Sequence, residues 1–347
     1  MRKVFTLPLL FFVLLLQGCG QLAYYTQSIG GQLEIWDKQR PVDEVINTTA
    51  DATLKAQLQL SQQIRDFASA ELGLPDNNSY RKYADLGRDY VLWNVFAAPE
   101  FSTEALTSCF LIVGCISYQG YFHKEEAQAR RDSLRAIGFD EDMGGVSAYS
   151  TIGYFNDPLL NTFIDYPETA LAALLFHELA HQVVYIEDDT VFNESFATAV
   201  QNAGTRRWLY VRNKPGLFQQ YTLNQQRDAQ VIQLILAYRK KLQQMYDRPD
   251  LNDKHKRARK QTLFAELKQA YHRLKAPWGE YRRYDGFFSK PLNNASLVPI
   301  GTYYDKVPAF EKLLQNLNGD LTAFYKEVKR IGDLPPTQRE QYFKQLQ

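Results

Sequence analysis

Two histidines and a glutamate in the middle of the sequence have the types and spacing suited to metal-assisted chemistry. They are His177, Glu178 and His181 in the stretch FHELAHQVVY, residues 176–185. On a helix, positions four apart occupy neighbouring turns of one face, so the two imidazoles can converge on one ion. Glu178 lies one step along the helix, where it can meet a metal-bound water without ligating the metal. The HExxH pattern therefore predicts a zinc centre with Glu178 as general base.

The helix predicted around this motif is apolar nearly all round, as Leu171, Leu175 and Leu179 show, so we expect it to be buried. An unpaired ionised carboxylate in such surroundings is costly. A metal ion with a bound water would satisfy all three polar side chains together. The competing interpretation is a polar core patch of hydrogen-bonded histidines. The remaining histidines lie in charged helical sequence and receive no role: His123, His255 and His272.

A zinc ion held by two imidazoles needs a third protein ligand if one tetrahedral position is to stay open for water. The acidic candidates downstream are the IEDD segment, residues 186–189, and Glu194. We expect IEDD to form a solvated turn after the helix. Glu194 instead lies between Phe192 and Phe196 at the start of the next helix. We therefore favour Glu194 as the third ligand, with Asp189 as the alternative.

The motif and the segment Asn193-Glu194-Ser195-Phe196-Ala197 resemble the gluzincin metallopeptidases, whose third ligand is a glutamate in a similar Asn-Glu-x-x-Ala setting. With the N-terminal signal and cysteine pair described below, the layout most resembles a bacterial family described as predicted zinc aminopeptidases. The close motif match covers residues 177–197. The resemblance implies a zincin-like α+β fold, one zinc ion per chain and hydrolysis of a peptide substrate.

The chain departs from better-known gluzincins in two ways. Twelve residues, 182–193, separate His181 from Glu194, which is shorter than in aminopeptidase N or thermolysin and predicts a direct helix-turn-helix return. Aminopeptidase N-like enzymes also hold the substrate's free amine with a glutamate in a Gly-x-Met-Glu-Asn strand. The corresponding stretch here, GGVSAYSTIGYF at 144–155, has no acidic residue.

That gap leaves two specificities open. Family resemblance favours an aminopeptidase, in which another carboxylate must hold the amine: Glu141 or Asp142 in FDEDM, or the IEDD turn. The competing interpretation of those residues is a solvent-facing acidic loop, and the missing glutamate then favours an endopeptidase. From another class, the chain could be a catalytically inactive zincin-like lipoprotein that binds peptide or an envelope partner.

The oxyanion of a tetrahedral intermediate needs a donor besides the metal. In gluzincins a tyrosine or histidine from a later segment fills this role. The segment GTYYDKVPAF, residues 301–310, offers Tyr303 and Tyr304, and we slightly prefer Tyr304. Because the chain has 22 tyrosines, a packing role is the alternative for each.

The N-terminus has a basic start and an apolar run from Val4 to Leu16, too short to span a bilayer and typical of a secretory signal. Residues 16–19, Leu-Gln-Gly-Cys, resemble the lipobox of bacterial lipoproteins, in which Cys19 becomes the lipid-modified terminus. Gly20 then favours an outer-membrane location, facing the periplasm. The alternative is cleavage nearby and a soluble periplasmic protein.

Export would place Cys109 and Cys115 in an oxidising compartment, where a disulfide between them can persist. The alternative is two unpaired buried thiols. No CxxC pair is present, so a cysteine-based metal site is not expected.

The length of 347 residues and hydrophobic content of 45% predict one folded body with lobes. We expect α+β architecture: a small mixed sheet beside the active helix, followed by a mostly helical C-terminal part. The predicted division is a signal peptide at 1–18, a tether and first helix at 19–45, a zincin-like catalytic core at 46–215, and a helical region at 216–347 with a helix pair at 217–275 and an irregular, site-capping segment at 291–310.

Within the core, the patterns predict strands at 89–99, 116–122 and 144–155, a helix at 123–138 and a second ligand helix at 192–210. The active helix should start at Asp165 as N-cap, with Pro167 in its first turn. The stretch 144–155 is expected to be an edge strand that a peptide could extend, or else an interior strand.

Charge excludes one class of partner. Lys plus Arg number 40 and Asp plus Glu 39, giving a formal net charge of +1. This balance offers no electrostatic basis for binding a polyanion, so nucleic acid is not expected as a partner.

Overall fold

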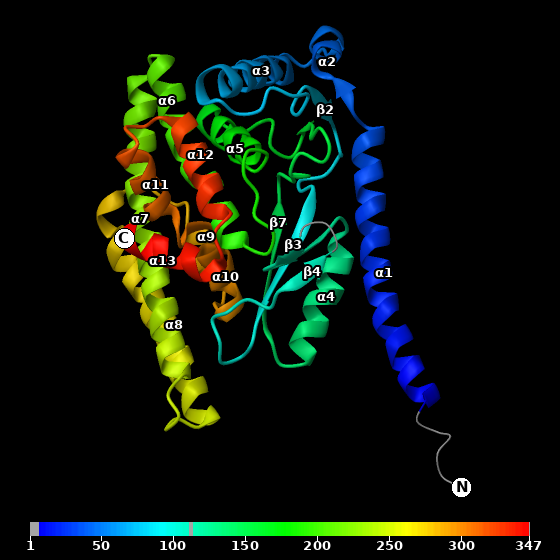
Figure 1. Cartoon of the computed structure of the whole chain (residues 1–347), viewed down its shortest axis with the longest axis vertical. Coiled ribbons are helices and arrows are strands. Elements are labelled where there is room, and N and C mark those ends of the chain that lie inside the picture. The colour runs from blue at the N-terminus through cyan, green and yellow to red at the C-terminus, as the bar shows by residue number, and fades with distance from the viewer. Residues whose placement is uncertain (1–6, 111–113, 347) are drawn as a thin grey trace.

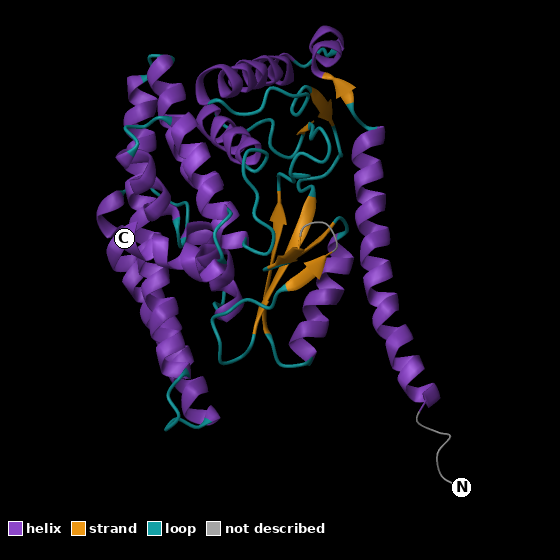
Figure 2. Ribbon diagram, in the orientation of Figure 1, coloured by secondary structure: helices purple, strands orange, loops and turns teal. Residues whose placement is uncertain are grey.

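The computed structural model describes residues 7–110 and 114–346, with side chains from Leu22 onward. The first six residues of the predicted signal peptide and the side chain of Cys19 lie outside this part. Figures 1 and 2 show α1 along one side of the molecule, the long α7 and α8 on the opposite side, and the strands between them. The helices are α1 (Leu7–Asp37), α2 (Val42–Thr48), α3 (Ala52–Leu72), α4 (Lys124–Ala136), α5 (Glu168–Ala180), α6 (Thr190–Val211), α7 (Pro215–Tyr246), α8 (Asp253–Lys275), the 3₁₀ turn η1 (Ala276–Trp278), α9 (Asp285–Ser289), α10 (Asn294–Tyr304), α11 (Val307–Asn316), α12 (Leu321–Gly332) and α13 (Pro336–Leu346).

The described strands form three small sheets, so the expected α+β class is confirmed, although the strand content is divided. One sheet is mixed, with order β1-β2-β8, in which β2 pairs antiparallel with β1 and parallel with β8. A second, antiparallel sheet has order β6-β3-β7, and β4 pairs with β5 in a hairpin. The strands are β1 (Arg40–Pro41), β2 (Lys82–Ala84), β3 (Leu92–Ala98), β4 (Ser108–Phe110), β5 (Gly114–Ile116), β6 (Gln119–Tyr121), β7 (Asp140–Val146) and β8 (Leu159–Leu160).

The central strand β3 is covered on both faces because its side chains alternate. Val95 and Ala97 pack with residues of α4, whereas Phe96 and Ala98 pack with Ala295 of α10. Successive side chains of a strand point to opposite faces, so both helices are fixed to one strand. This arrangement brings α10, late in the sequence, against the sheet that precedes the active helix.

The predicted strand at 144–155 is wrong over most of its length. β7 starts earlier, at Asp140, and ends at Val146, and its pairing with β3 runs from Leu92↔Val146 to Ala98↔Asp140. Ile152 and Gly153 have positive φ values of 57° and 81°, which belong to a turn and cannot continue an extended strand. β7 lies at an edge of its sheet, one of the two positions left open for this stretch, and Nδ2 of Asn293 donates to the Glu141 carbonyl at this edge (2.8 Å).

The segment 291–310 was also expected to be irregular. In the structure it contains the helix α10, over Asn294–Tyr304. Asn293 and Ser296 form a reciprocal capping box at its start, and Pro299 lies inside the helix. Asn293 and Ser296 are the sequence signal for the start of a helix. The proline and glycine of this segment made that signal hard to recognise. α10 contacts α6, α7, β3 and β7, so it joins the C-terminal helices to the central sheet.

The main hydrophobic core surrounds α3, α5 and α6, and a second cluster lies between α7 and α8. α5 and α6 approach closely at Gly204, where an added Cβ would lie 2.7 Å from Cδ1 of Leu72 and 2.9 Å from Cδ2 of Phe176. Phe176 directly precedes the first motif histidine. The packing of α6 therefore fixes the part of α5 that carries the motif.

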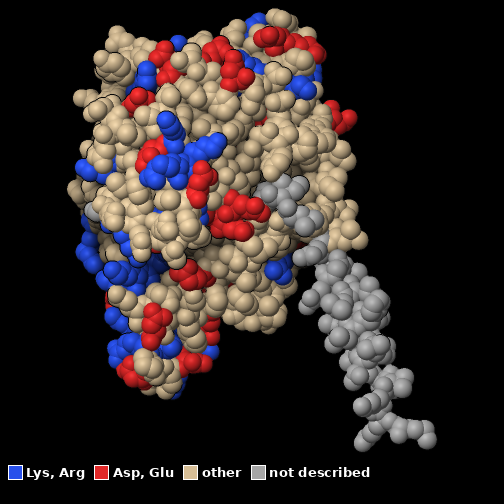
Figure 3. All heavy atoms as spheres, viewed as in Figure 1, with Lys and Arg blue, Asp and Glu red and all other residues tan. Residues whose placement is uncertain are grey.

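The N-terminal region forms one continuous helix over Leu7–Asp37, where the sequence predicts a tether before the first helix. Gly31 lies against the ring of Phe122, which docks α1 beside the core. Within the described residues, no helix combines the length and apolar character needed to cross a membrane. On the face shown in Figure 3, basic and acidic side chains are interspersed.

Candidate active site

α5 presents the motif at its C-terminal end. His177 and Glu178 lie in its last turn, and His181 is the C-cap residue, still with helical backbone angles. The helix begins at Glu168 after an extended Pro167, so the prediction of Asp165 as N-cap is wrong. Glu168 accepts a hydrogen bond from Nε1 of Trp208 (3.0 Å), which ties the start of α5 to α6.

α6 returns directly after a short turn, as the spacing predicts. Asp189 caps its first turn by accepting from the Phe192 N–H (3.0 Å). The Asn193 side chain holds the turn itself: its oxygen accepts from the Ile186 N–H (2.7 Å) and its nitrogen donates to the Ile186 carbonyl (2.7 Å). Glu194, the next residue, is thereby fixed relative to the end of α5.

The side chains of His177, His181 and Glu194 are buried and converge on one point. Nε2 of His177 lies 3.1 Å from Oε2 of Glu194 and 3.3 Å from Nε2 of His181, and the third edge, His181 to Glu194, is 3.5 Å. Ligands about 2.0–2.1 Å from a tetrahedral ion lie about 3.3 Å apart. The triangle therefore has the edges that such an ion requires, and two imidazoles with one carboxylate are a donor set that suits zinc.

The two histidines are held in different ways. Nδ1 of His177 lies 3.1 Å from Oε1 of Gln201, two turns beyond Glu194 on α6, and this contact orients the ring so that Nε2 faces the cluster. Nδ1 of His181 is buried and has no hydrogen-bond partner among the described residues. The polar contacts of its ring are those of Nε2 with His177 and Glu194.

Electrostatics favour the anionic form of the candidate ligand Glu194. Burial alone would raise its pKa, but the charges and hydrogen bonds of His181 and His177 outweigh burial and lower the pKa to about 2. Burial likewise acts to lower the pKa of His181, and Glu194 more than reverses this, so that pKa is raised. The site thus favours a charged carboxylate between the two imidazoles.

Glu178 has the opposite tendency. Burial raises the pKa of Glu178, with the two histidines opposing and Glu194 adding to the rise. A carboxyl group whose pKa lies closer to neutrality is a better proton shuttle than an ordinary surface glutamate. Its proton affinity therefore differs from that of Glu194.

Tyr303 is the tyrosine beside the cluster. Its ring stacks against that of His177, with centroids 6.2 Å apart and planes 22° apart. Ser195 fixes this end of α10, because its hydroxyl donates to the Tyr303 carbonyl (3.4 Å) and accepts from the Lys306 N–H (3.2 Å). For Tyr304, burial raises the pKa against the effect of Arg283, so its phenol faces different charges.

The family of this chain follows from a match over most of its length. The chain matches the sequence profile of the family described as "Putative aminopeptidase" over residues 23–343. The chain belongs to this aminopeptidase family. The expected resemblance to an aminopeptidase family is thereby confirmed. No curated protein and no solved structure matches the chain.

In this member of the aminopeptidase family, the alternative ligand Asp189 is occupied elsewhere. Besides capping α6, it pairs with Nε of Arg339 at 3.1 Å. The group of described residues that could hold a metal ion contains Glu194 and not Asp189. The structure thus places the carboxylate preferred from sequence beside the histidines.

The two carboxylates considered for the substrate amine also have cationic partners. Glu141 pairs with Arg135 (2.5 Å) and Asp142 with Lys290 (2.9 Å). Both acidic residues lie in β7, where the sequence suggested a loop. Neither is a free anion poised for an ammonium group.

Sequence reasoning missed Gln201 and Tyr118. Gln201 could have been found by helical spacing, because it lies seven residues after Glu194 and so shares its face of α6. Tyr118 lies between β5 and β6; burial raises the pKa of its phenol well above the usual range, and the charge of Glu194 is the next cause. No local pattern marks Tyr118, since only the fold brings this segment to the cluster.

A third missed group is Asp157, in the loop between β7 and β8. Asp157 is buried, and its carboxylate accepts from the Thr151 N–H (3.0 Å), the Thr151 hydroxyl (2.8 Å) and the Ser150 hydroxyl (3.2 Å). Burial raises the pKa of Asp157 to about 6, and Glu178 contributes to the rise against these hydrogen bonds. Asp157 organises the loop after β7 in the neighbourhood of the motif.

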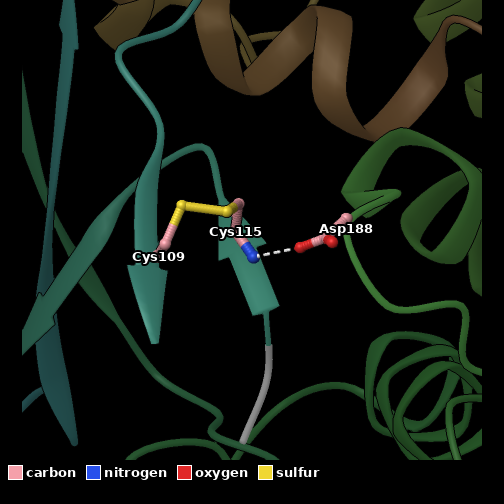
Figure 4. The surroundings of a disulfide bond; sticks show 3 residues. All are labelled: Cys109, Cys115 and Asp188. Carbon is pink, nitrogen blue, oxygen red and sulfur yellow. Dashed lines mark hydrogen bonds between the residues drawn. A yellow bond between two sulfur atoms is a disulfide. The ribbon is translucent and has the colours of Figure 1, made fainter. Parts of the chain in front are cut away.

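Cys109 and Cys115 form a disulfide in the structure, with their sulfur atoms 1.97 Å apart. The bond crosslinks β4 and β5, in which the two residues are also register partners. It closes the hairpin next to the turn that joins α5 to α6, as Figure 4 shows.

Proposed function

We propose that this chain is a zinc-dependent aminopeptidase of the bacterial cell envelope. The observation that carries the proposal is the triangle of His177, His181 and Glu194 in a chain of the aminopeptidase family. The two helices that bear these ligands meet as in a zincin-like fold, and the edges of the triangle fit a tetrahedral ion.

When bound, zinc supplies a Lewis acid that polarises a peptide carbonyl and makes water nucleophilic near neutral pH. Glu178 takes the proton from that water and passes it to the leaving amine, for which its raised pKa suits it. Gln201 holds the His177 ring in its orientation. Tyr303, stacked beside that ring, donates a hydrogen bond to the developing oxyanion.

The metal is tested by replacing a ligand. Zinc-loaded protein should contain about one zinc ion per chain, and Glu194→Ala should lose it, because removing one of three donors destroys the triangle. Mass spectrometry of metal in desalted protein measures this. Arg339→Ala, which frees the alternative ligand Asp189 from its ion pair, is the matched control and should keep zinc. Zinc retained by Glu194→Ala and lost in Asp189→Ala would transfer the ligand role to Asp189.

Exopeptidase specificity is tested with one peptide library in free and N-acetylated forms. An aminopeptidase hydrolyses the free peptides and leaves the acetylated ones, since it needs the positive terminal amine. Equal cleavage of both forms, at internal bonds, would instead establish an endopeptidase. Zinc binding without cleavage of either would identify an inactive zincin-like protein that binds peptide.

Attachment to the envelope rests on the N-terminal sequence and the disulfide. Residues 16–19 resemble a lipobox, so we propose lipidation at Cys19. The Cys109–Cys115 disulfide suits an oxidising compartment. The mature protein would then be anchored by lipid to the outer membrane and face the periplasm. Cys19→Ser should release the protein from membrane fractions, whereas unchanged fractionation would remove the anchor from the proposal.

A further inference from the structure

α6 carries two polar rows that contact different parts of the molecule. Glu194 and Gln201, seven positions apart, both reach the first motif histidine. Ser195 and Asn202 each follow one residue later, and one residue turns a helix by about 100°. Ser195 contacts the junction of α10 and α11, and Nδ2 of Asn202 donates to Oε1 of Glu311 on α11 (3.1 Å). The helix that supplies a candidate metal ligand therefore also holds the C-terminal helices.

The Ser195 hydroxyl serves both helix ends at this junction. It donates to the Tyr303 carbonyl (3.4 Å) in the last turn of α10 and accepts from the N–H of Lys306 (3.2 Å), the N-cap residue of α11. Carbonyls at the end of a helix and N–H groups at its start have no partner within the helix. A hydroxyl can satisfy one group of each kind, because it donates and accepts at once.

Burial makes this hydroxyl hard to replace. Ser195 is 0% exposed, and Lys306 is buried beside it. A buried polar group that loses its partner is destabilising, because neither water nor another protein group satisfies it. Lys306 is also held from the far side, since its Nζ pairs with Oε2 of Glu340 on α13 (2.5 Å). Without the Ser195 hydroxyl, the end of α10 must shift to find new partners for these backbone groups.

The residue whose carbonyl Ser195 holds is also the tyrosine beside the candidate metal ligands. The Tyr303 ring stacks against that of His177, with centroids 6.2 Å apart and planes 22° apart. Glu194, directly before Ser195, lies 3.1 Å from Nε2 of the same histidine. Two successive residues of α6 therefore contact the imidazole and the backbone of the tyrosine that faces it.

We infer that Ser195 is a positioning residue, which holds the backbone of Tyr303 so that the tyrosine ring lies against His177. α6 then sets both the candidate metal ligands and the place of Tyr303 beside them. This inference rests on the proposed peptidase function, in which the Tyr303 hydroxyl donates to the developing oxyanion.

A double-mutant cycle tests the link between the two residues. Ser195→Ala should lower kcat about tenfold or more, because a misplacement of about 1 Å can cost up to about 100-fold. Zinc content should not change, since the three candidate donors remain. In the Tyr303→Phe background, Ser195→Ala should add less than about twofold, because the hydroxyl that it positions is already absent. Losses that multiply in the double variant would overturn the inference.

Ser61→Ala is the matched control for the loss of a buried hydroxyl. Ser61 is 0% exposed and donates to the Leu58 carbonyl (2.7 Å) within α3, away from the junction. This variant should keep its kcat even if its Tm falls as far as that of Ser195→Ala. An equal loss of kcat in both would mean that general destabilisation is the cause, and would overturn the inference.

Asn202→Ala keeps the inference testable if Ser195→Ala does not fold. It removes the second contact of the same row from a side chain that is only partly buried. The variant should lower kcat, by less than Ser195→Ala, without loss of zinc. Full activity of Asn202→Ala beside an unfolded Ser195→Ala would reduce the row to a stabilising contact and overturn the inference.

Histidine NMR of the metal-free chain tests the position of the tyrosine without turnover. The chain has five histidines, so the ring signal of His177 can be assigned by its loss in His177→Gln. Tyr303→Leu deletes the neighbouring aromatic ring and shifts that signal. Ser195→Ala should move it in the same direction, and Ser61→Ala should leave it in place.

The NMR result separates this inference from the proposed function. If the wild type binds zinc but cleaves no peptide, the proposed function fails, whereas a shifted His177 signal in Ser195→Ala still supports the positioning of Tyr303. If the wild type cleaves peptides and the His177 signal of Ser195→Ala stays in place, the proposed function stands and the inference about Ser195 is overturned.

Discussion

Glu178 on α5 and Glu194 on α6 have opposite electrostatic environments. The histidines lower the pKa of Glu194 to about 2, whereas burial raises the pKa of Glu178. One carboxylate is suited to stay charged as a ligand, and the other to exchange a proton. This separation assigns their roles without reference to the order of residues in the motif.

Glu178→Gln tests the proton-transfer role. The substitution conserves volume and leaves the three donor atoms in place, so zinc content should not change. Loss of the proton acceptor should lower kcat by about 10²–10⁴-fold, the usual contribution of general acid–base catalysis. Initial rates and metal analysis of one preparation measure both quantities. Activity close to wild type would mean that another group takes the proton.

The two adjacent tyrosines can be distinguished in the same way. Tyr303→Phe should lower kcat by about 10²–10³-fold, the effect of removing an oxyanion donor, because its ring stacks on His177. Tyr304→Phe is the matched control and should change kcat less than about twofold. Steady-state kinetics with a free peptide decides between them. The reverse result would return the role to Tyr304, which the sequence slightly favoured.

At the scale of single elements, prediction succeeded where one period dominates. The helices at Lys124–Ala136 and Thr190–Val211 follow from their spacing, and the apolar stretch around the motif forms α5. It failed where turn residues and period conflict. A strand was predicted from residue 144 to residue 155, but the observed strand β7 ends at Val146. Pro299 hid the helix α10, which a capping box starts.

The contact of α5 with α6 gives an element-scale prediction. Gly204→Ala should lower the free energy of unfolding by about 1–3 kcal/mol, because the new methyl group would press on Leu72 and Phe176. Urea unfolding of the metal-free protein measures this. Gly216→Ala is the control. Gly216 is an exposed residue of α7, and an added Cβ there would meet no other atom within 4 Å, so this variant should not lose stability. Equal stabilities of the two variants would show that α6 can shift away.

At the scale of the whole molecule, Asp157 makes stability depend on pH. Its pKa is about 6 in the folded chain and about 3.9 in an unfolded one, so the folded state binds more protons between these values. Its contribution to stability is therefore complete below about pH 4 and is lost as pH rises through 6. The shift corresponds to about 3 kcal/mol.

Comparison with Asp157→Asn isolates this effect from other titrating groups. The stability of wild type relative to the variant should fall by about 2 kcal/mol between pH 4 and pH 7, which is most of the full shift. Chemical unfolding of the metal-free proteins across this range measures the difference. A difference that is constant with pH would mean that Asp157 titrates normally.

The candidate site was predictable to the extent that it is local. His177, Glu178, His181 and Glu194 could be named because one helix-turn-helix holds them, and helical spacing is readable in sequence. The contacts of Tyr118 could not be named, since β3 and α10, which pack around it, are far away in the sequence. Local geometry is encoded locally, whereas the walls of a site depend on contacts between distant segments.

The short turn held by the Asn193 side chain affects the order in which the candidate site can assemble. His177 and Glu194 are 17 positions apart and Gln201 is 24 from His177, so one brief stretch contains the three donors and an orienting partner. Ser195 and Tyr303, by contrast, are 108 positions apart. Closing a short loop costs less entropy than closing a long one. In the proposed peptidase, the candidate ligands can thus converge before α10 docks, whereas Tyr303 reaches His177 only once α10 has packed against α6.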